Sequence, residues 1–163
     1  MVRKEWAEFD RIAPSVSDAI TAIGAVVKES TLEPELIELV KIRASQINGC
    51  AYCTQLHLNV ARKLGMAPER LDLLAVWLEA GIYSKREAAA LAWTELLTDV
   101  AHGSVSDEAY AEIHAHFSEA EVAALTAAII QINAWNRLGA TYRMSPPIPR
   151  RSRAAASNGP AAS

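Results

Sequence analysis

Recurring signals that begin and end helices constrain the fold of this chain more than any other feature of its sequence. Residues 84–87 and 118–121 both have the Ser-x-x-Glu pattern of a capping box, in which two side chains bond free backbone N–H groups. Pro14 and Pro34 suit the first turn of a helix, and Asn48-Gly49 is a natural stop. No strand pair or hairpin turn stands out, and the abundant alanine favours helices. The sequence therefore predicts an all-α fold of about six to eight helices.

Apolar residues at helical spacing give the expected bounds of these helices. We expect helices over about 14–28, 34–47, 50–64, from 68 onward, 85–101, 107–116 and 119–144. The helix that begins at Pro68 should have one apolar side, made of Leu71, Leu74, Ala75 and Leu78. Arg43 projects into the apolar arc of its helix, so we expect it to be paired or to lie at a subunit contact.

Length and composition indicate one domain and a tail. The 163 residues, 51% of them hydrophobic and 21% charged, suit one ordinary globular domain, which we place at residues 1–145. Residues 146–163 contain prolines, arginines and then small residues, and we expect them to form a disordered C-terminal tail.

Charge and hydropathy limit the partners and the compartment. The formal charge of −3 gives no reason to expect nucleic acid or an anionic membrane as a partner, and no apolar run reaches the length of a bilayer span. The N-terminus is charged and lacks the apolar core of a signal peptide, so we expect a cytoplasmic protein. Thiols there are mostly kept reduced, which favours a catalytic or metal-binding use of a cysteine pair over a structural one.

The only two cysteines, Cys50 and Cys53, stand three residues apart and are followed by His57. If this segment is helical, each residue turns the chain by roughly 100°, so His57 points within about 40° of Cys53 and about 20° of Cys50. Two thiols and an imidazole therefore share one face near the N-terminal end of a helix. Such a site is either a redox site or a metal site.

The spacing of these residues bears on both alternatives. A zinc site needs four ligands, whereas this pattern supplies three, and the gap before His57 is short of a zinc-finger pattern. A peroxide needs a thiolate, a proton for the leaving group and a second thiol, and this segment contains all three. Two inert buried cysteines and an ordinary histidine would also give this sequence. We expect no metal and no bound cofactor.

The residues around the cysteine pair resemble a known family. Glu38, the segment 43–53, His57 and the segment 61–62 resemble the AhpD-like alkylhydroperoxidase branch of the carboxymuconolactone decarboxylase superfamily; so do residues 86–98 and 134–139. The resemblance implies an all-helical homo-oligomer, a trimer or a hexamer. It also implies a thiol peroxidase that acts on a small hydroperoxide and is reduced by an external thiol or dithiol.

The resemblance also implies roles for single residues. Cys53 would form the sulfenic acid, Cys50 would close a redox-active disulfide with it, and His57 and Glu38 would relay protons. Helical geometry alone does not select Glu38, which is equally suited to be a solvated carboxylate or a partner of Lys41. Tyr52 stands where the peroxidase that names the family has a second histidine. Its unperturbed pKa of about 10 makes it a pocket candidate and not a base.

Two other functions stay open at this point. The superfamily also includes decarboxylases of muconolactone-like acids, an activity that does not need the cysteine pair. The chain could instead be a thiol redox sensor, whose disulfide reports oxidation without turnover. Steady-state turnover with a dithiol separates an enzyme from a sensor.

Overall fold

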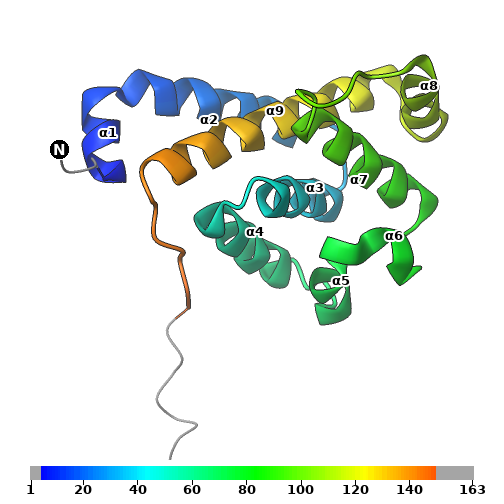
Figure 1. The fold of residues 1–163 in the computed structure, drawn as a ribbon, viewed down its shortest axis with the longest axis horizontal. Helices are drawn as coiled ribbons and strands as arrows, with labels where there is room; N and C mark the ends of the chain where they lie inside the picture. The colour runs from blue at the N-terminus through cyan, green and yellow to red at the C-terminus, as the bar shows by residue number, and fades with distance from the viewer. Residues whose placement is uncertain (1–4, 150–163) are drawn as a thin grey trace, which may run out of the picture.

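The computed structural model describes residues 5–149. Within them the chain forms nine α-helices and one 3₁₀ turn, η1, and no strand: α1 Trp6–Ile12, α2 Pro14–Lys28, α3 Pro34–Ile47, α4 Ala51–Lys63, α5 Pro68–Asp72, η1 Leu74–Val76, α6 Trp77–Ala80, α7 Lys85–Thr98, α8 Asp107–His116 and α9 Glu119–Thr141 (Figure 1). The all-α prediction is confirmed. The helix count exceeds the expected six to eight because α1 is a separate short helix and the segment after Pro68 is broken.

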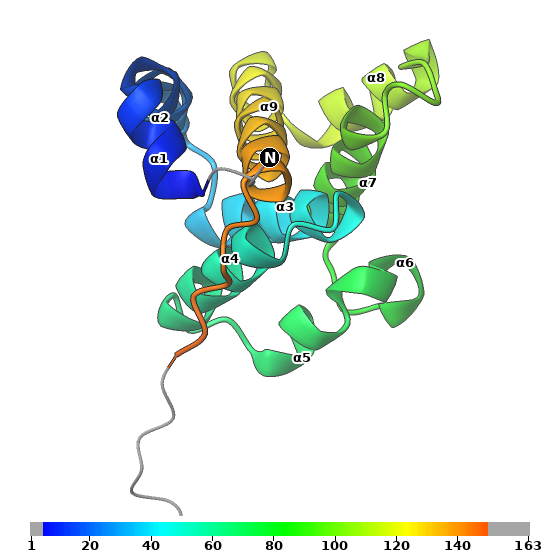
Figure 2. The ribbon, with the colours of Figure 1, turned by 60° about the vertical axis from the view of Figure 1, so that its left-hand side comes forward.

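The central element is α3, which packs against α4, α7 and α9 (Figure 2). On its other side α9 packs along α2. Leu39, Val40, Ile42 and Ala44 of α3 are fully buried, and residues of this helix belong to each of the three buried apolar clusters. Burial on all sides means that a polar residue of α3 needs a partner inside the protein. Glu38 and Ser45 are the two buried polar residues of this helix.

The predicted helix ends are confirmed where they depend on local signals. Both capping boxes form, with the serine side chain and the glutamate side chain each bonded to the other residue's backbone N–H. Gly49 and Gly65 end their helices at φ +65° and +82°, a backbone region that favours glycine. Arg43 is paired, since its Nε donates to Glu95 Oε1 at 2.7 Å.

The prediction of one continuous helix from Pro68 onward is wrong in its second half. The chain leaves α5 at Asp72, passes through the 3₁₀ turn and ends α6 at Gly81 with φ +66°. Leu71 and Leu74 are buried as predicted, but the third buried position is Trp77, while Leu78 is 79% exposed. A spacing of three residues is the period of a 3₁₀ helix. The hydrogen bond from Trp77 Nε1 to Glu95 Oε1 at 2.7 Å, with the burial of the indole, favours this register.

Two further findings concern the ends of the chain and the length of its helices. Residues 146–149 of the predicted tail contain no regular secondary structure, and residues 150–163 lie outside the described part of the chain. None of the helices from residue 5 to residue 149 is both long and apolar enough to cross a membrane.

Candidate active site

The two cysteines form a disulfide at the N-terminal end of α4. The turn at Gly49 makes Cys50 the N-cap residue of the helix, and its Sγ accepts a hydrogen bond from the backbone N–H of Cys53 at 3.2 Å. Both cysteines are only 3% exposed. The backbone N–H groups at this end of a helix stabilise negative charge, so the position favours a thiolate when the disulfide is open.

Helix α9 closes the back of the disulfide at Gly139. A Cβ atom on this glycine would lie 2.8 Å from Cys50 Sγ and 3.4 Å from Cys53 Sγ. No side chain fits at the first distance without movement of its neighbours, so the absence of a side chain at Gly139 allows α9 to approach the sulfur atoms. Sequence reasoning missed this residue, although it lies in the 134–139 segment that resembles the family.

His57 lies one turn after Cys53 and is held by Glu38 of α3. Its Nδ1 lies 2.8 Å from Glu38 Oε2, and Glu38 is 7% exposed. Because a carboxylate accepts hydrogen bonds, this contact places a proton on Nδ1 and leaves Nε2 outside the pair. Of the alternatives left open by the sequence, Glu38 is neither a solvated carboxylate nor the ion-pair partner of Lys41. The structure thus brings together Glu38, His57 and the cysteine pair.

An amide network fixes the turn that precedes Cys50. Asn48 Nδ2 donates to Asn133 Oδ1 at 3.0 Å and to Asn136 Oδ1 at 2.9 Å. Asn136 in turn donates to Ser45 Oγ at 3.0 Å. These bonds tie the end of α3, and with it the turn before Cys50, to the helix that carries Gly139. Two asparagines among the buried apolar residues of α9 are the sequence signal for this network, which the sequence-based prediction missed.

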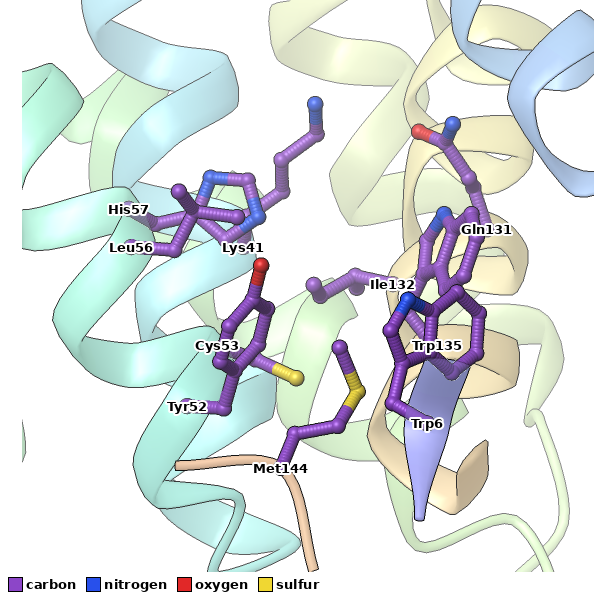
Figure 3. A pocket seen from close by; sticks show the side chains of 10 residues that line it. All are labelled: Trp6, Lys41, Tyr52, Cys53, Leu56, His57, Gln131, Ile132, Trp135 and Met144. Carbon is purple, nitrogen blue, oxygen red and sulfur yellow. The ribbon is translucent and has the colours of Figure 1, made fainter. Parts of the chain in front are cut away.

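Cys53 faces a pocket of about 240 Å³ between α3, α4 and α9 (Figure 3). Its sulfur points into the pocket, and Tyr52 and His57 line the same wall. Tyr52 therefore lies where the sequence placed it, in the pocket wall. The facing wall is apolar and includes Trp6 and Trp135, whose rings meet edge to face at 5.6 Å between centroids. The site is a small, largely apolar pocket with a sulfur and an imidazole on one side.

Lys41 and Gln131 supply the polar groups at the end of the pocket away from the Cys53 sulfur (Figure 3). Burial lowers the pKa of Lys41 from its ordinary value, while the nearby Glu38 carboxylate acts in the opposite direction. Within the described part of the chain the ammonium group of Lys41 makes no hydrogen bond or ion pair, and the Glu38 carboxylate is bonded to His57 through Oε2.

Cys50 lines a second and more open hollow on the other side of the disulfide. Pro146 and Ile148, from the segment after α9, form part of its wall. This segment is held against α4 by a hydrogen bond from Asn59 Nδ2 to the Pro147 carbonyl oxygen at 2.8 Å. The two sulfur atoms of the disulfide can therefore be approached from different sides.

The residues at the site are not arranged as a set of metal ligands. Across residues 5–149, no group of three or more His, Cys, Asp or Glu side chains is arranged to hold a metal ion. Glu38, the nearest carboxylate to His57, is already its hydrogen-bond partner through Nδ1. The geometry is that of a disulfide beside a largely buried histidine–carboxylate pair.

Comparison with known proteins extends this description. A sequence model of the carboxymuconolactone decarboxylase family matches residues 14–96. The chain is 38% identical over 130 residues to the uncharacterized protein YdfG of Bacillus subtilis (strain 168), a match that covers 80% of this chain and 88% of YdfG. Its fold is similar to that of a protein of unknown function from Agrobacterium tumefaciens, proposed to be the antioxidant defence protein AhpD. That match has a TM-score of 0.82 and 35% identity, and covers 86% of this chain and 97% of the other.

A more distant structure has the same fold. The debrominase Bmp8 matches with a TM-score of 0.72 and 20% identity, over 82% of this chain and 72% of its own. A likeness at that identity concerns the fold alone, and one fold supports several chemistries. The activity of this chain must therefore be argued from its own site.

Proposed function

This chain belongs to the carboxymuconolactone decarboxylase family and to its AhpD-like branch, and from that premise we propose that it is a thiol-dependent peroxidase. Its substrates are hydrogen peroxide or organic hydroperoxides. The observation that carries the proposal is the joint position of Cys53 and His57 on one wall of the pocket, with Cys50 bonded to Cys53 and Glu38 bonded to His57. These are the groups that two-electron reduction of a peroxide needs.

The reaction begins from the open dithiol. His57 Nε2 takes the proton of the Cys53 thiol, and the thiolate attacks the terminal oxygen of the hydroperoxide. The O–O bond breaks, Cys53 becomes a sulfenic acid, and the alkoxide leaves with the proton from His57 as an alcohol. Glu38 keeps the imidazole in the tautomer that exposes Nε2 and stabilises its charged form. The Cys50 thiol then attacks the sulfenic sulfur, and the disulfide forms with release of water.

The assignment of the attacking sulfur to Cys53 depends on the pocket. The N-cap position of Cys50, with its N–H···S bond, would also stabilise a thiolate on Cys50. Cys50, however, does not line the pocket that holds His57, whereas Cys53 does. A hydroperoxide with an organic group needs that pocket, so Cys53 is the sulfur that it meets.

An external thiol or dithiol completes the cycle by reducing the disulfide. Its thiolate attacks Cys50 Sγ from the open hollow, the S–S bond breaks, and Cys53 leaves as a thiolate beside His57. A second donor thiol then attacks the mixed disulfide and frees Cys50. In this scheme each peroxide consumed oxidises two donor thiols to one disulfide, so the electrons balance.

Single cysteine variants and a dithiol test the proposal. The wild-type protein should consume hydroperoxide continuously with dithiothreitol as the donor. In Cys50→Ser, one equivalent of peroxide should leave a sulfenic acid on Cys53 that a dimedone probe traps, because no thiol resolves it. Cys53→Ser should fall to the background rate. Formation of sulfenic acid on Cys50 at the wild-type rate in Cys53→Ser would reverse the two roles.

The same assay separates the other functions considered for this chain. A redox sensor would form the disulfide once and would not turn over with dithiothreitol. A decarboxylase of a muconolactone-like acid would release carbon dioxide and keep its activity in the Cys50→Ser, Cys53→Ser double variant. Continuous, cysteine-dependent loss of hydroperoxide excludes both.

The proposal includes assembly and compartment. Large apolar side chains are exposed around α5 and α6, with Val76 at 54%, Leu78 at 79% and Ile82 at 44%. Such exposure is typical of a surface covered by another chain. We therefore propose a homo-oligomer, and from the family resemblance a trimer or a hexamer in the cytoplasm. Light scattering at micromolar concentration should give the mass of a multimer. A measured mass of 17.6 kDa, that of one chain, would refute the proposed assembly.

A further inference from the structure

The pocket has two chemically different ends. Cys53 and His57 stand at one end, and the ammonium group of Lys41 and the amide of Gln131 stand at the other (Figure 3). Between them the wall is formed by Ile132 and by the indole of Trp135. A peroxide alone needs only the first end, because the attack and the proton transfer both take place there. The apolar wall and the distant cation indicate a larger ligand.

Lys41 is a cation without a contact partner. Its pKa is lowered chiefly by burial, which is the cost of removing an ammonium group from water. The nearby Glu38 carboxylate acts in the opposite direction and raises this pKa, but it is hydrogen-bonded to His57 and makes no ion pair with Lys41. The second charged influence on Lys41 is Lys28, which is also a cation and lowers the same pKa further. Among the described residues no anion is in direct contact with the Lys41 ammonium group, and a bound carboxylate would supply that contact.

Lys41 does not take part in the thiol chemistry directly. Its ammonium group points away from the Cys53 sulfur, and His57 occupies the position one turn from that sulfur (Figure 3). A lysine at the far end of the pocket can contact a substrate only at a group remote from the reacting oxygen. Its role is therefore binding and specificity.

The other polar residue at this end of the pocket strengthens this interpretation. Gln131 is 8% exposed, and its Nε2 donates to the Ile20 carbonyl oxygen at 3.0 Å. This bond fixes the amide at the wall of the pocket, so the end that holds Lys41 is built from anchored groups. The volume of about 240 Å³ is below the range of roughly 300–1,000 Å³ that is usual for drug-sized ligands. The body of the ligand is therefore one ring or a short branched chain.

We propose that Lys41 forms an anion subsite, and that the preferred substrates are small apolar hydroperoxides with a carboxylate at the end opposite the peroxide group. The carboxylate binds Lys41, the apolar body lies against Trp135 and Ile132, and the peroxide reaches Cys53. The hydroperoxide part of this inference rests on the proposed peroxidase function. The carboxylate subsite does not, because the pocket is present while the disulfide is closed.

Binding to the disulfide form tests the subsite without any reaction. The probes are para-isopropylbenzoate and para-isopropylbenzamide, which have nearly the same shape and differ in charge. Titration calorimetry of the wild-type protein should show at least about tenfold tighter binding of the benzoate, as expected for a charge-assisted hydrogen bond. Equal affinity for the two probes would overturn the proposal. This comparison needs no variant, so it does not depend on the folding of one.

Lysine variants then assign the preference to one residue. Lys41→Met keeps an unbranched side chain of nearly the same length and removes its charge, so this variant should bind the two probes equally. Lys41→Arg should keep the preference for the benzoate. Lys63→Met is the matched control, because Lys63 is an exposed lysine near the end of α4 and does not line the pocket. A benzoate preference that survives Lys41→Met, or that is lost in Lys63→Met, would contradict the assignment.

Turnover separates this inference from the function on which it rests. The substrates are cumene hydroperoxide and its para-carboxylate, each with dithiothreitol. The wild-type kcat/KM should be at least about tenfold higher for the carboxylate, and this ratio should fall toward one in Lys41→Met. Equal turnover of both substrates would refute the subsite and leave the peroxidase in place. A lysine-dependent benzoate preference without any turnover would refute the peroxidase and leave the subsite in place.

Discussion

The approach of α9 to the disulfide gives the sharpest test of the site's architecture. In Gly139→Ala the new Cβ would lie 2.8 Å from Cys50 Sγ, so the helix or the sulfur atom must move. Overpacking of this kind costs about 1–3 kcal/mol. Alanine in a helix interior gains about 1 kcal/mol over glycine. In the wild-type background the free energy of unfolding should therefore fall by about 0–2 kcal/mol.

The Cys50→Ala background removes the atom that causes the overlap. The remaining contact, to Cys53 Sγ at 3.4 Å, is close to ordinary van der Waals distance. In this background the higher helix propensity of alanine over glycine should dominate, so Gly139→Ala should raise the free energy of unfolding by up to about 1 kcal/mol. The two backgrounds should thus differ by about 1–3 kcal/mol in the effect of the same substitution, a coupling measured by a double-mutant cycle.

Urea unfolding at one fixed protein concentration measures the four free energies, because association would otherwise shift the midpoints. Gly103→Ala is the matched control, since a Cβ there meets no atom within 4 Å and its effect should be the same in both backgrounds. A coupling below about 0.5 kcal/mol between Gly139→Ala and Cys50→Ala would refute the argument. It would mean that α9 does not press against the Cys50 sulfur.

Three further predictions concern the proton relay, the acid limit of stability and metal content. Glu38→Gln keeps a hydrogen-bond acceptor for His57 but loses the negative charge. Oxidation of the reduced protein by peroxide, measured in a single turnover, should therefore slow by about tenfold to a hundredfold, with both thiols still titratable. An unchanged rate would exclude Glu38 from the proton relay. A hydrogen bond from the backbone N–H of Ser118, and with a smaller effect one from the Arg86 side chain, lower the pKa of Glu121 from 4.5 to about 2. A depressed carboxyl pKa stabilises the fold above the unfolded value, and this contribution is lost as pH falls from 4.5 toward about 2. Urea midpoints measured across that window should therefore depend less on pH in Glu121→Gln, and an identical pH dependence would refute the assignment. Elemental analysis of the purified protein should find no stoichiometric zinc, and a chelator should leave the thermal unfolding transition unchanged. If the protein instead contains one zinc ion per chain, and unfolds when a chelator removes it, the redox interpretation is wrong.

Sequence by itself determined the features that depend on neighbours in the chain. The capping boxes at Ser84 and Ser118 and the glycine at position 49 act within a few residues, so their geometry follows from local chemistry. The same is true of Cys50 and Cys53, which one helical turn brings together. Helix propensity and spacing were sufficient for these because no distant partner is involved.

Where local helix preference and the burial of side chains favoured different conformations, tertiary packing determined the conformation of the chain. The segment after Pro68 has the spacing of one α-helix, yet burying Trp77 and bonding it to Glu95 of α7 favours a broken path. The energy of that contact depends on a helix 18 residues further along the chain. Propensity is a weak preference, and a buried aromatic residue with a satisfied N–H outweighs it.

The site beyond the cysteine pair was also decided by packing. Glu38 contacts His57, 19 residues further along the chain, because α3 packs on α4. Only the resemblance to the family indicated this pair from the sequence, since helical geometry alone does not select Glu38. Gly139 reaches the disulfide because α9 packs on α3 and α4, where Asn48 bonds Asn136 across 88 residues. Such contacts depend on how helices cross, which is set by the fit of whole apolar surfaces and not by any local pattern. Sequence therefore identified the candidate reactive groups, while the packing of α3, α4 and α9 determined the pocket around them.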